Sequence, residues 1–119
     1  MPDQIERFCS MAVFHGEQMV AGTLYHNWHP ESGVIELTSA STDRRWLTKT
    51  VVKAMFHMAF AMIGAQLAVL RVSERNTGMV EIAQRFGFQG TLIPRLRGRT
   101  ESEWIFTLTD DDWRASRWS

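Results

Sequence analysis

The segment at residues 41–48, Ser-Thr-Asp-Arg-Arg-Trp-Leu-Thr, places two arginines just before an expected helix. The first turn of a helix presents backbone N–H groups without intrahelical partners and a partial positive charge, which together suit a phosphate. Arg44 and Arg45 would add full positive charges and fork-shaped donors. Two arginines on a surface turn are more simply explained as solvated, and the segment has no glycine-rich phosphate loop. The segment alone is therefore only a candidate anion site.

A second candidate is Asn76, which lies between an expected buried strand and an expected helix. The simplest explanation of Asn76 is a helix N-cap, because its side-chain oxygen can accept a hydrogen bond from a first-turn amide. Gly87 would then end the helix, and Phe88 would return the chain to the core.

The segment from Pro94 to Ser102 carries three arginines in five positions: Arg95, Arg97 and Arg99. Such a cluster could contact an acidic acceptor or RNA. No aromatic side chains are interleaved with these arginines, so a solvated loop between two strands is the favoured interpretation.

The elements that must position these residues follow from hydrophobic patterning. Strands are expected at residues 11–14, 19–25, 34–40, 66–73, 88–93 and 103–109, and the main helices at residues 46–63 and 77–86. We expect residues 26–33 to form a loop, and residues 2–8 and the tail after an Asp110 cap to form short helical turns. The order β-β-β-α-β-α-β-β predicts an α/β (α+β) domain with one mixed sheet of about six strands. The strands at 34–40 and 66–73 should be parallel, joined by the first helix.

Composition limits the class of protein. The 119 residues favour one domain spanning 1–119, and 13 basic against 13 acidic side chains give no net charge to attract nucleic acid or an anionic membrane. One cysteine, Cys9, excludes an internal disulfide framework. No apolar run is long enough for a membrane helix, and the N-terminus has no signal pattern, so a cytoplasmic protein is expected.

The pattern Asn76-x-x-Met79-x-x-x-Ala83-x-x-x-Gly87-Phe88, behind a strand ending in VSERN, resembles the second half of a GNAT superfamily N-acetyltransferase. The segments IELTSAS and RRWLT, followed by a helix ending in AFAMIG, are similar to those of a bacterial and phage-associated branch of that superfamily. The resemblance covers about residues 11–109. It implies a GNAT-like fold and direct transfer of an acetyl group from acetyl-CoA to a primary amine.

The resemblance also implies roles for individual residues. The turn of Arg44, Arg45, Trp46, Leu47 and Thr48 would wrap the pyrophosphate of acetyl-CoA, mainly through backbone N–H groups. In GNAT folds the strand at 34–40 splays away from the strand at 66–73, and acetyl-CoA fills the gap. Its pantetheine arm would pair with the backbone near Ser39 and Ala40, and Asn76 would hydrogen-bond the arm from the other side.

Glu36 is the best candidate for the general base that removes a proton from an ammonium acceptor, because it lies mid-strand beside this gap. A solvent-facing carboxylate on a half-exposed strand is an equally good explanation. His26 and His29 are weaker candidates, and without a cysteine or clustered carboxylate beside them no metal site is expected. Tyr25, the single tyrosine, could act as an acid, but packing is the favoured interpretation.

Three features depart from the family pattern. The usual Q/R-x-x-G-x-G/A turn is replaced by Asp43-Arg-Arg-Trp-Leu-Thr48, in which bulky residues make a close approach of phosphate harder. The first strand and helix of the family are expected to be missing, which would shorten the wall that binds the acceptor. The hydroxyl residue often found in the helix after the asparagine is absent, and Thr77 is the nearest hydroxyl.

These observations lead to an acetyl-CoA-dependent N-acetyltransferase acting on a small-molecule or peptide amine. One alternative is a non-catalytic acyl-CoA-binding or degenerate GNAT module, and another is a structural or partner-binding protein that keeps the fold. A homodimer is also possible, since Trp104, Trp113 and Trp118 could form an apolar contact surface.

Overall fold

The computed structural model describes the backbone of residues 9–15, 18–41 and 48–119, and these residues form a six-stranded sheet with the order β1-β2-β3-β4-β6-β5. The strands are β1 (Cys9–His15), β2 (Gln18–His29), β3 (Val34–Ser41), β4 (Leu67–Ser73), β5 (Gln89–Ile93) and β6 (Glu103–Thr109). β3 and β4 pair in parallel, and the other neighbours pair antiparallel. The mixed sheet and the parallel crossover are therefore as predicted.

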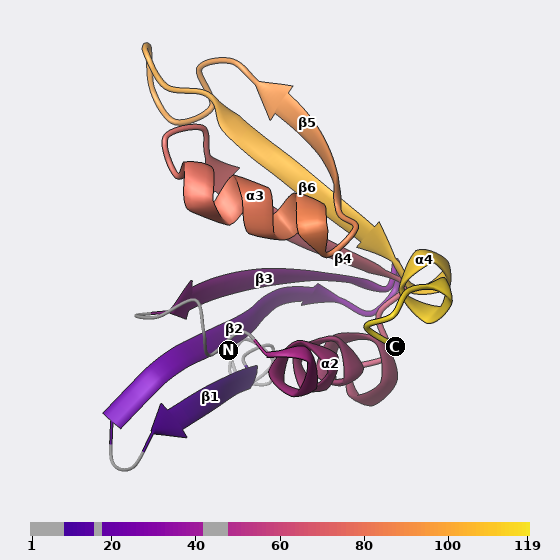
Figure 1. The fold of residues 1–119 in the computed structure, drawn as a ribbon. Helices are drawn as coiled ribbons and strands as arrows, with labels where there is room; N and C mark the ends of the chain where they lie inside the picture. The colour runs from indigo at the N-terminus through magenta and orange to yellow at the C-terminus, as the bar shows by residue number, and fades with distance from the viewer. Residues whose placement is uncertain (1–8, 16–17, 42–47) are drawn as a thin grey trace, which may run out of the picture.

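Helices connect and follow the strands (Figure 1). They are α2 (Lys49–His57), the π-helix η2 (Met58–Met62), α3 (Thr77–Arg85) and α4 (Asp110–Ala115). The two main helices and the strand order agree with the sequence pattern. The helical turn expected at residues 2–8 lies outside the described residues.

Two predictions are wrong, the start of the loop at residues 26–33 and the Asp110 cap, and the first main helix has a feature that its pattern did not predict. Residues 26–29 belong to β2 rather than to a loop, because a shift in the pairing register between His26 and His29 lets the strand continue to the pair His29–Val34. The helix that follows β3 changes from α to π geometry at Met58, where the Ile63 N–H donates to the Met58 carbonyl oxygen at 2.8 Å. Thr109, rather than Asp110, caps α4 through its hydroxyl.

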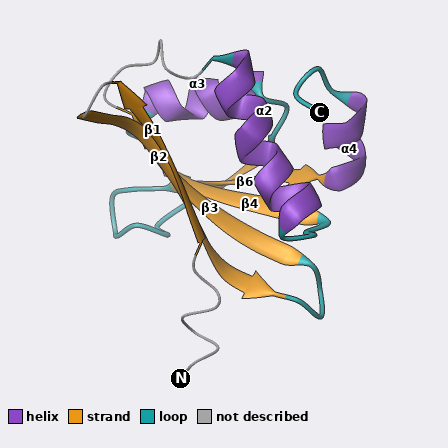
Figure 2. Cartoon of the chain, turned by 90° about the horizontal axis from the view of Figure 1, so that it is seen from below, coloured by secondary structure: helices purple, strands orange, loops and turns teal. Residues whose placement is uncertain are grey.

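The helices lie on one side of the sheet and cover its apolar face (Figure 2). Phe56 of α2 is fully buried and packs edge-on against Phe86 at the end of α3, with ring centroids 5.8 Å apart. Phe60 of η2 stacks on Trp113 of α4 at 5.0 Å. The same face of the sheet supplies Ile35 and Leu70, so a single core joins the helices to the strands.

Several residues considered for function serve this core. Tyr25 is fully buried, and its hydroxyl donates to the Met55 carbonyl oxygen at 2.7 Å, so it packs as expected. Trp118 is buried, Trp113 is half-buried, and Trp104 stacks on Phe106 with centroids 5.5 Å apart. The three tryptophans thus bury much of their apolar surface within the chain, and the suggested homodimer stays a prediction.

Among the described residues, none of the helices has the length and apolar character needed to cross a membrane.

Candidate functional site

The strands β3 and β4 part before either one ends. Their register pairs Val34 with Leu67 and continues to the pair Leu37–Leu70, which is the last pair between them. β3 continues to Ser41 along β2, and β4 continues to Ser73 along β6. Figure 1 shows the ends of the two strands diverging. Backbone groups that face the opening must find partners in water, a side chain or a ligand.

Glu36 lies at the start of this opening, one residue before the last pair. Side chains alternate between the two faces of a strand. Tyr25 and Leu37 are buried against the helices, so His26 and Glu36 project from the opposite face. Their side chains are 18% and 19% exposed. The carboxylate is therefore neither fully solvated nor part of the apolar core.

Glu36 is held by neighbouring polar side chains. Its Oε2 atom lies 3.2 Å from His26 Nδ1 and accepts a hydrogen bond from Asn27 Nδ2 at 3.0 Å. The other imidazole nitrogen, His26 Nε2, lies 2.8 Å from the Thr38 hydroxyl. The sequence pattern singles out Glu36 and His26 separately, but it predicts His26 in a loop and gives no signal for Asn27 or Thr38.

Asn76 caps α3, because its Oδ1 atom accepts a hydrogen bond from the Met79 N–H at 3.3 Å. The cap lies three residues beyond β4, close to the end where β4 has left β3. Within the part of the chain that the structure describes, no hydrogen bond engages Asn76 Nδ2. The capping role is confirmed, and the contact with acetyl-CoA stays a prediction.

The other predicted binding residues belong to the end of β3 and the segment after it. Ser39 pairs with Thr23 and Ala40 with Gly22 on β2, so β3 remains extended there. Arg44, Arg45, Trp46 and Leu47 lie outside the described residues. Thr48 is the N-cap of α2, and its hydroxyl accepts a hydrogen bond from the Val51 N–H at 3.3 Å.

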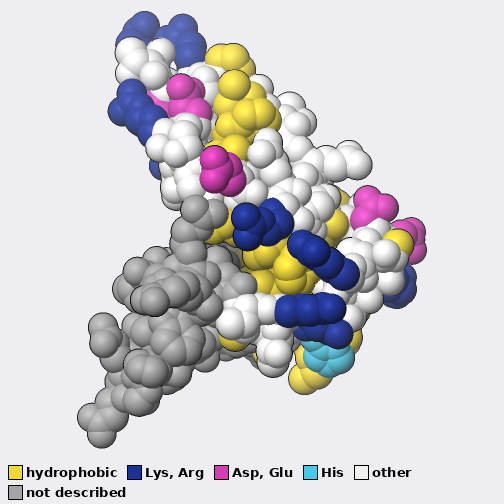
Figure 3. Space-filling model, in the orientation of Figure 1, with side chains coloured by type: hydrophobic (Ala, Val, Ile, Leu, Met, Phe, Trp, Pro, Cys, Tyr) yellow, Lys and Arg dark blue, Asp and Glu magenta, His cyan; other side chains and the backbone are white. Residues whose placement is uncertain are grey.

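A polar cluster lies at the carboxyl end of β4, and the sequence pattern singles out only one of its members, Arg97. Glu103 is 3% exposed and accepts hydrogen bonds from Arg71 Nε at 2.8 Å and Arg97 Nε at 2.6 Å. Burial raises the pKa of the Glu103 carboxyl, but the hydrogen bonds and charges of Arg97 and Arg71 outweigh burial and hold the pKa below its ordinary value. Arg97 therefore anchors the loop between β5 and β6. Cationic side chains gather at that tip of the molecule (Figure 3).

The same loop is tied to β4 by carboxylates. The Ser102 backbone N–H donates to Glu74, and the Ser73 hydroxyl donates to Glu101. Hydrogen bonds from the Ser102 hydroxyl and backbone hold the pKa of Glu74 below its ordinary value. No local pattern could have revealed these pairs, because the partners are about 28 residues apart.

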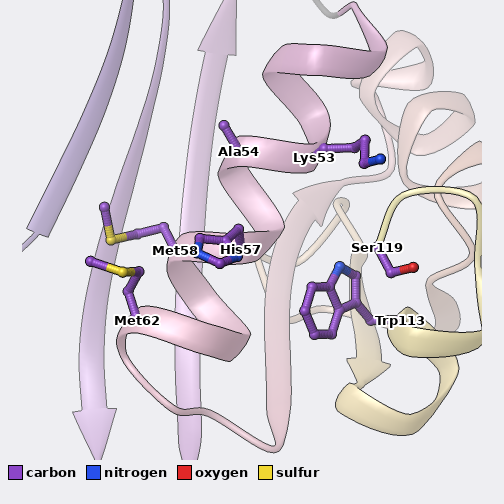
Figure 4. Close-up of a pocket in the computed structure, with 7 residues that line it drawn as sticks. All are labelled: Lys53, Ala54, His57, Met58, Met62, Trp113 and Ser119. Atoms are coloured by element: carbon purple, nitrogen blue, oxygen red, sulfur yellow. The ribbon is translucent and has the colours of Figure 1, made fainter.

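An open hollow of about 470 Å³ lies on the helical side of the molecule, between α2–η2 and the C-terminal segment. Lys53 and His57 of α2 lie across from Trp113 and Ser119 (Figure 4). Apolar atoms form most of its surface although Lys53, His57 and Ser119 are among the lining residues, and it is on the opposite face of the sheet from Glu36. Across the described ranges, no group of three or more His, Cys, Asp or Glu side chains could hold a metal ion.

Comparison with solved structures decides the fold. A spermidine N-acetyltransferase SpeG variant from Vibrio cholerae superposes with a TM-score of 0.81 over 97% of this chain and 74% of its own, at 11% sequence identity. A protein named as a probable acetyltransferase of the GNAT family from Chromobacterium violaceum gives a TM-score of 0.74 over 95% of this chain and 66% of its own, at 21% identity. This chain has the GNAT acetyltransferase fold.

The GNAT fold is recognised here from structure, since no protein-family model and no curated protein sequence matches the chain. A third solved structure gives a TM-score of 0.75 at 15% identity. The chain spans 60% of that protein, 66% of the Chromobacterium protein and 74% of the Vibrio enzyme. The resemblance of the Asn76-to-Phe88 segment to GNAT sequences is thus supported at the level of the fold.

Proposed function

We propose that this chain binds acetyl-CoA between the parted ends of β3 and β4 and transfers its acetyl group to a primary amine. The parting beyond Leu37 and Leu70 carries the proposal. It leaves strand edges to which a ligand containing amides can hydrogen-bond as an added strand would. The pantetheine arm of acetyl-CoA contains such amides, and the TM-scores of 0.74 to 0.81 with acetyltransferases support this assignment.

The backbone of Ser39 and Ala40 would bind the arm from β3, and Asn76 Nδ2 would donate to it from the side of β4. The pyrophosphate would lie at Arg44, Arg45, Trp46, Leu47 and Thr48, in front of α2. The Thr48 oxygen already caps α2, so Thr48 would act through its backbone. The first-turn N–H groups of Lys49 and Thr50 are further donors for a phosphate.

Glu36 would act as the general base. The amine nitrogen attacks the thioester carbonyl carbon, a C–N bond forms, and the C–S bond breaks to release the thiolate of CoA. After attack the nitrogen loses a further proton, which would pass to the thiolate and give the CoA thiol. The ammonium form of the acceptor must lose a proton before attack, and Glu36 would receive it at the edge of the opening. The chain would contribute mainly by holding the two reactants and this base in place.

The acceptor is proposed to be a small-molecule or peptide amine. Spermidine is the first compound to test, because the similar Vibrio protein is named a spermidine N-acetyltransferase. We further propose that the reaction takes place in the cytoplasm. A homodimer is also proposed, and it would be detected in solution as a particle of twice the mass of the chain.

The proposal is tested first by thermal unfolding with acetyl-CoA. A ligand that binds only the folded chain at 100 times its Kd stabilises it by about 2.7 kcal/mol, so the Tm must rise. An unchanged Tm together with no binding by calorimetry would reject the proposal and favour a structural or partner-binding protein.

Release of CoA thiol in the presence of an amine panel then separates an enzyme from a binder. Amine-dependent release that is lost in Glu36→Gln supports the proposed chemistry. A chain that binds acetyl-CoA but releases no thiol with any amine would be a non-catalytic acyl-CoA-binding module.

A further inference from the structure

Two consecutive residues of β2 bind the same oxygen of Glu36. His26 Nδ1 lies 3.2 Å from Oε2, and Asn27 Nδ2 donates to Oε2 at 3.0 Å. Neighbouring residues of a regular strand point to opposite faces of the sheet, so they cannot both reach one atom. This contact therefore requires a local departure from regular strand geometry.

The departure is a bulge in β2. The register pairs His26 with Glu36 and His29 with Val34, so Asn27 and Trp28 together lie opposite the single residue Ile35. Asn27 has a φ of 52°, in the left-handed region that non-glycine residues seldom occupy. Bulges redirect side chains, and unusual backbone conformations often accompany functional sites. Here the bulge directs Asn27 to the carboxylate that His26 already contacts.

The contacts of the ring favour one tautomer of His26. With Nδ1 facing Glu36 Oε2, a neutral ring would carry its hydrogen on Nδ1, and Nε2, which lies 2.8 Å from the Thr38 hydroxyl, would accept from it. The ring is thus held at both nitrogens. Glu36 lies at the start of the opening, and Thr38 is the first residue of β3 beyond the last pair.

We propose that His26 and Asn27 form a clamp that positions Glu36 for proton transfer; this inference rests on the proposed acetyltransferase function. Both donors of the clamp occupy Oε2, and within the described residues Oε1 has no hydrogen-bond partner. Oε1 is the atom that would face the ammonium group of the acceptor. A carboxylate held in one orientation keeps this oxygen in reach of the reacting amine, which a freely rotating side chain would not.

His26 is thereby assigned as a positioning residue that acts through Glu36. A different role, in which Nε2 receives the proton through Thr38, would make His26 itself the base. The two roles use different nitrogens of the ring, so substitutions that preserve one nitrogen position at a time can separate them.

The experiment compares His26→Asn with His26→Gln in the full chain. The amide nitrogen of asparagine can occupy the position of Nδ1 and keep the donor to Glu36. The longer glutamine side chain reaches the position of Nε2 and keeps the contact with Thr38. We expect His26→Asn to retain kcat within about threefold and His26→Gln to lower it about tenfold, since a hydrogen bond to a charged group is lost. The KM for acetyl-CoA should not change in either variant.

Equal losses of kcat in the two variants, with both chains folded, would overturn the clamp and favour His26 as the base. An unchanged kcat in both variants would overturn any role of His26 in catalysis. Asn27→Gly is a second test that does not strain the fold, because glycine adopts the observed φ without cost. It removes one clamp donor and should lower kcat several-fold with little change in the KM for acetyl-CoA, and an unchanged kcat would count against the clamp.

A readout independent of activity is the ¹⁵N NMR spectrum of the imidazoles, with the His26 signal identified by its loss in His26→Asn. The clamp requires the Nδ1–H tautomer in the wild-type chain and a change in that signal in Glu36→Gln. If these signals are as expected but the wild-type chain acetylates no amine, the proposed function fails and the clamp has no catalytic role. If the wild-type chain is active but the His26 signal is unchanged in Glu36→Gln, the clamp is overturned and the proposed function is not.

Discussion

Leu37 of β3 and Leu70 of β4 form the last residue pair between two strands that both continue further. The two side chains are buried on the helical face of the sheet. Val72, two residues further along β4, is buried in the same core, so the strands part although β4 still contributes to the core. Beyond this pair, β3 stays paired with β2 and β4 stays paired with β6. We propose that the reaction takes place in the resulting opening.

Asn76 caps α3 and is the proposed contact of acetyl-CoA, and substitution can separate the two roles. Asn76→Asp keeps the oxygen that accepts from the Met79 N–H but removes the Nδ2 donors, whereas Asn76→Ala removes both. We expect the free energy of unfolding to fall by about 1 kcal/mol in the alanine variant and to change little in the aspartate variant. Acetyl-CoA affinity, measured by calorimetry, should fall about tenfold in both. Wild-type affinity in the folded aspartate variant would reject the assigned contact.

Glu103 should make stability depend on pH. Its folded-state pKa lies below the ordinary value of 4.5, so its stabilising effect is complete above that value and is lost as the pH falls through the lowered pKa. We expect Glu103→Gln to lower the free energy of unfolding at pH 7 by about 1–2 kcal/mol, a modest figure because the arginines are half-exposed. Urea unfolding of both chains from pH 7 to pH 3 should show the difference shrinking in acid. A difference independent of pH would contradict the assignment.

Gly90 of β5 has no room for a side chain. A Cβ atom there would lie 2.5 Å from Phe106 Cε1 and 2.9 Å from Trp104 Cε3, and these two rings stack on each other. Gly90→Ala should therefore destabilise the chain by about 1–3 kcal/mol in urea unfolding. Gly78→Ala is the matched control, because a Cβ atom at that position would have no neighbour within 4 Å, and it should raise stability by up to about 1 kcal/mol. Equal effects of the two substitutions would contradict this packing.

Tyr25 links the sheet to α2. Its buried hydroxyl donates to the Met55 carbonyl oxygen, so Tyr25→Phe should lower the free energy of unfolding by about 1 kcal/mol without creating a cavity. If Tyr25 serves packing alone, kcat per folded molecule stays at the wild-type level. A large loss of kcat without loss of stability would instead support Tyr25 as the acid.

The amino-acid sequence determined the elements of this protein and their order. β-branched and apolar runs indicated β3, β4 and β6, and the spacing of Met79, Ile82, Ala83 and Phe86 indicated α3, because such patterns reflect which side faces the core. Asn76 as a helix cap was likewise predictable, since the cap needs only residues three apart. The GNAT resemblance also came from local motifs.

Tertiary structure decided the relationships that join distant residues. The pair at which β3 leaves β4, the bulge that brings His26 and Asn27 to Glu36, and the burial of Glu103 between Arg71 and Arg97 depend on register between strands. Register is set by how whole faces pack, and a shift of one residue would turn every side chain to the other face. Local sequence patterns do not carry that information.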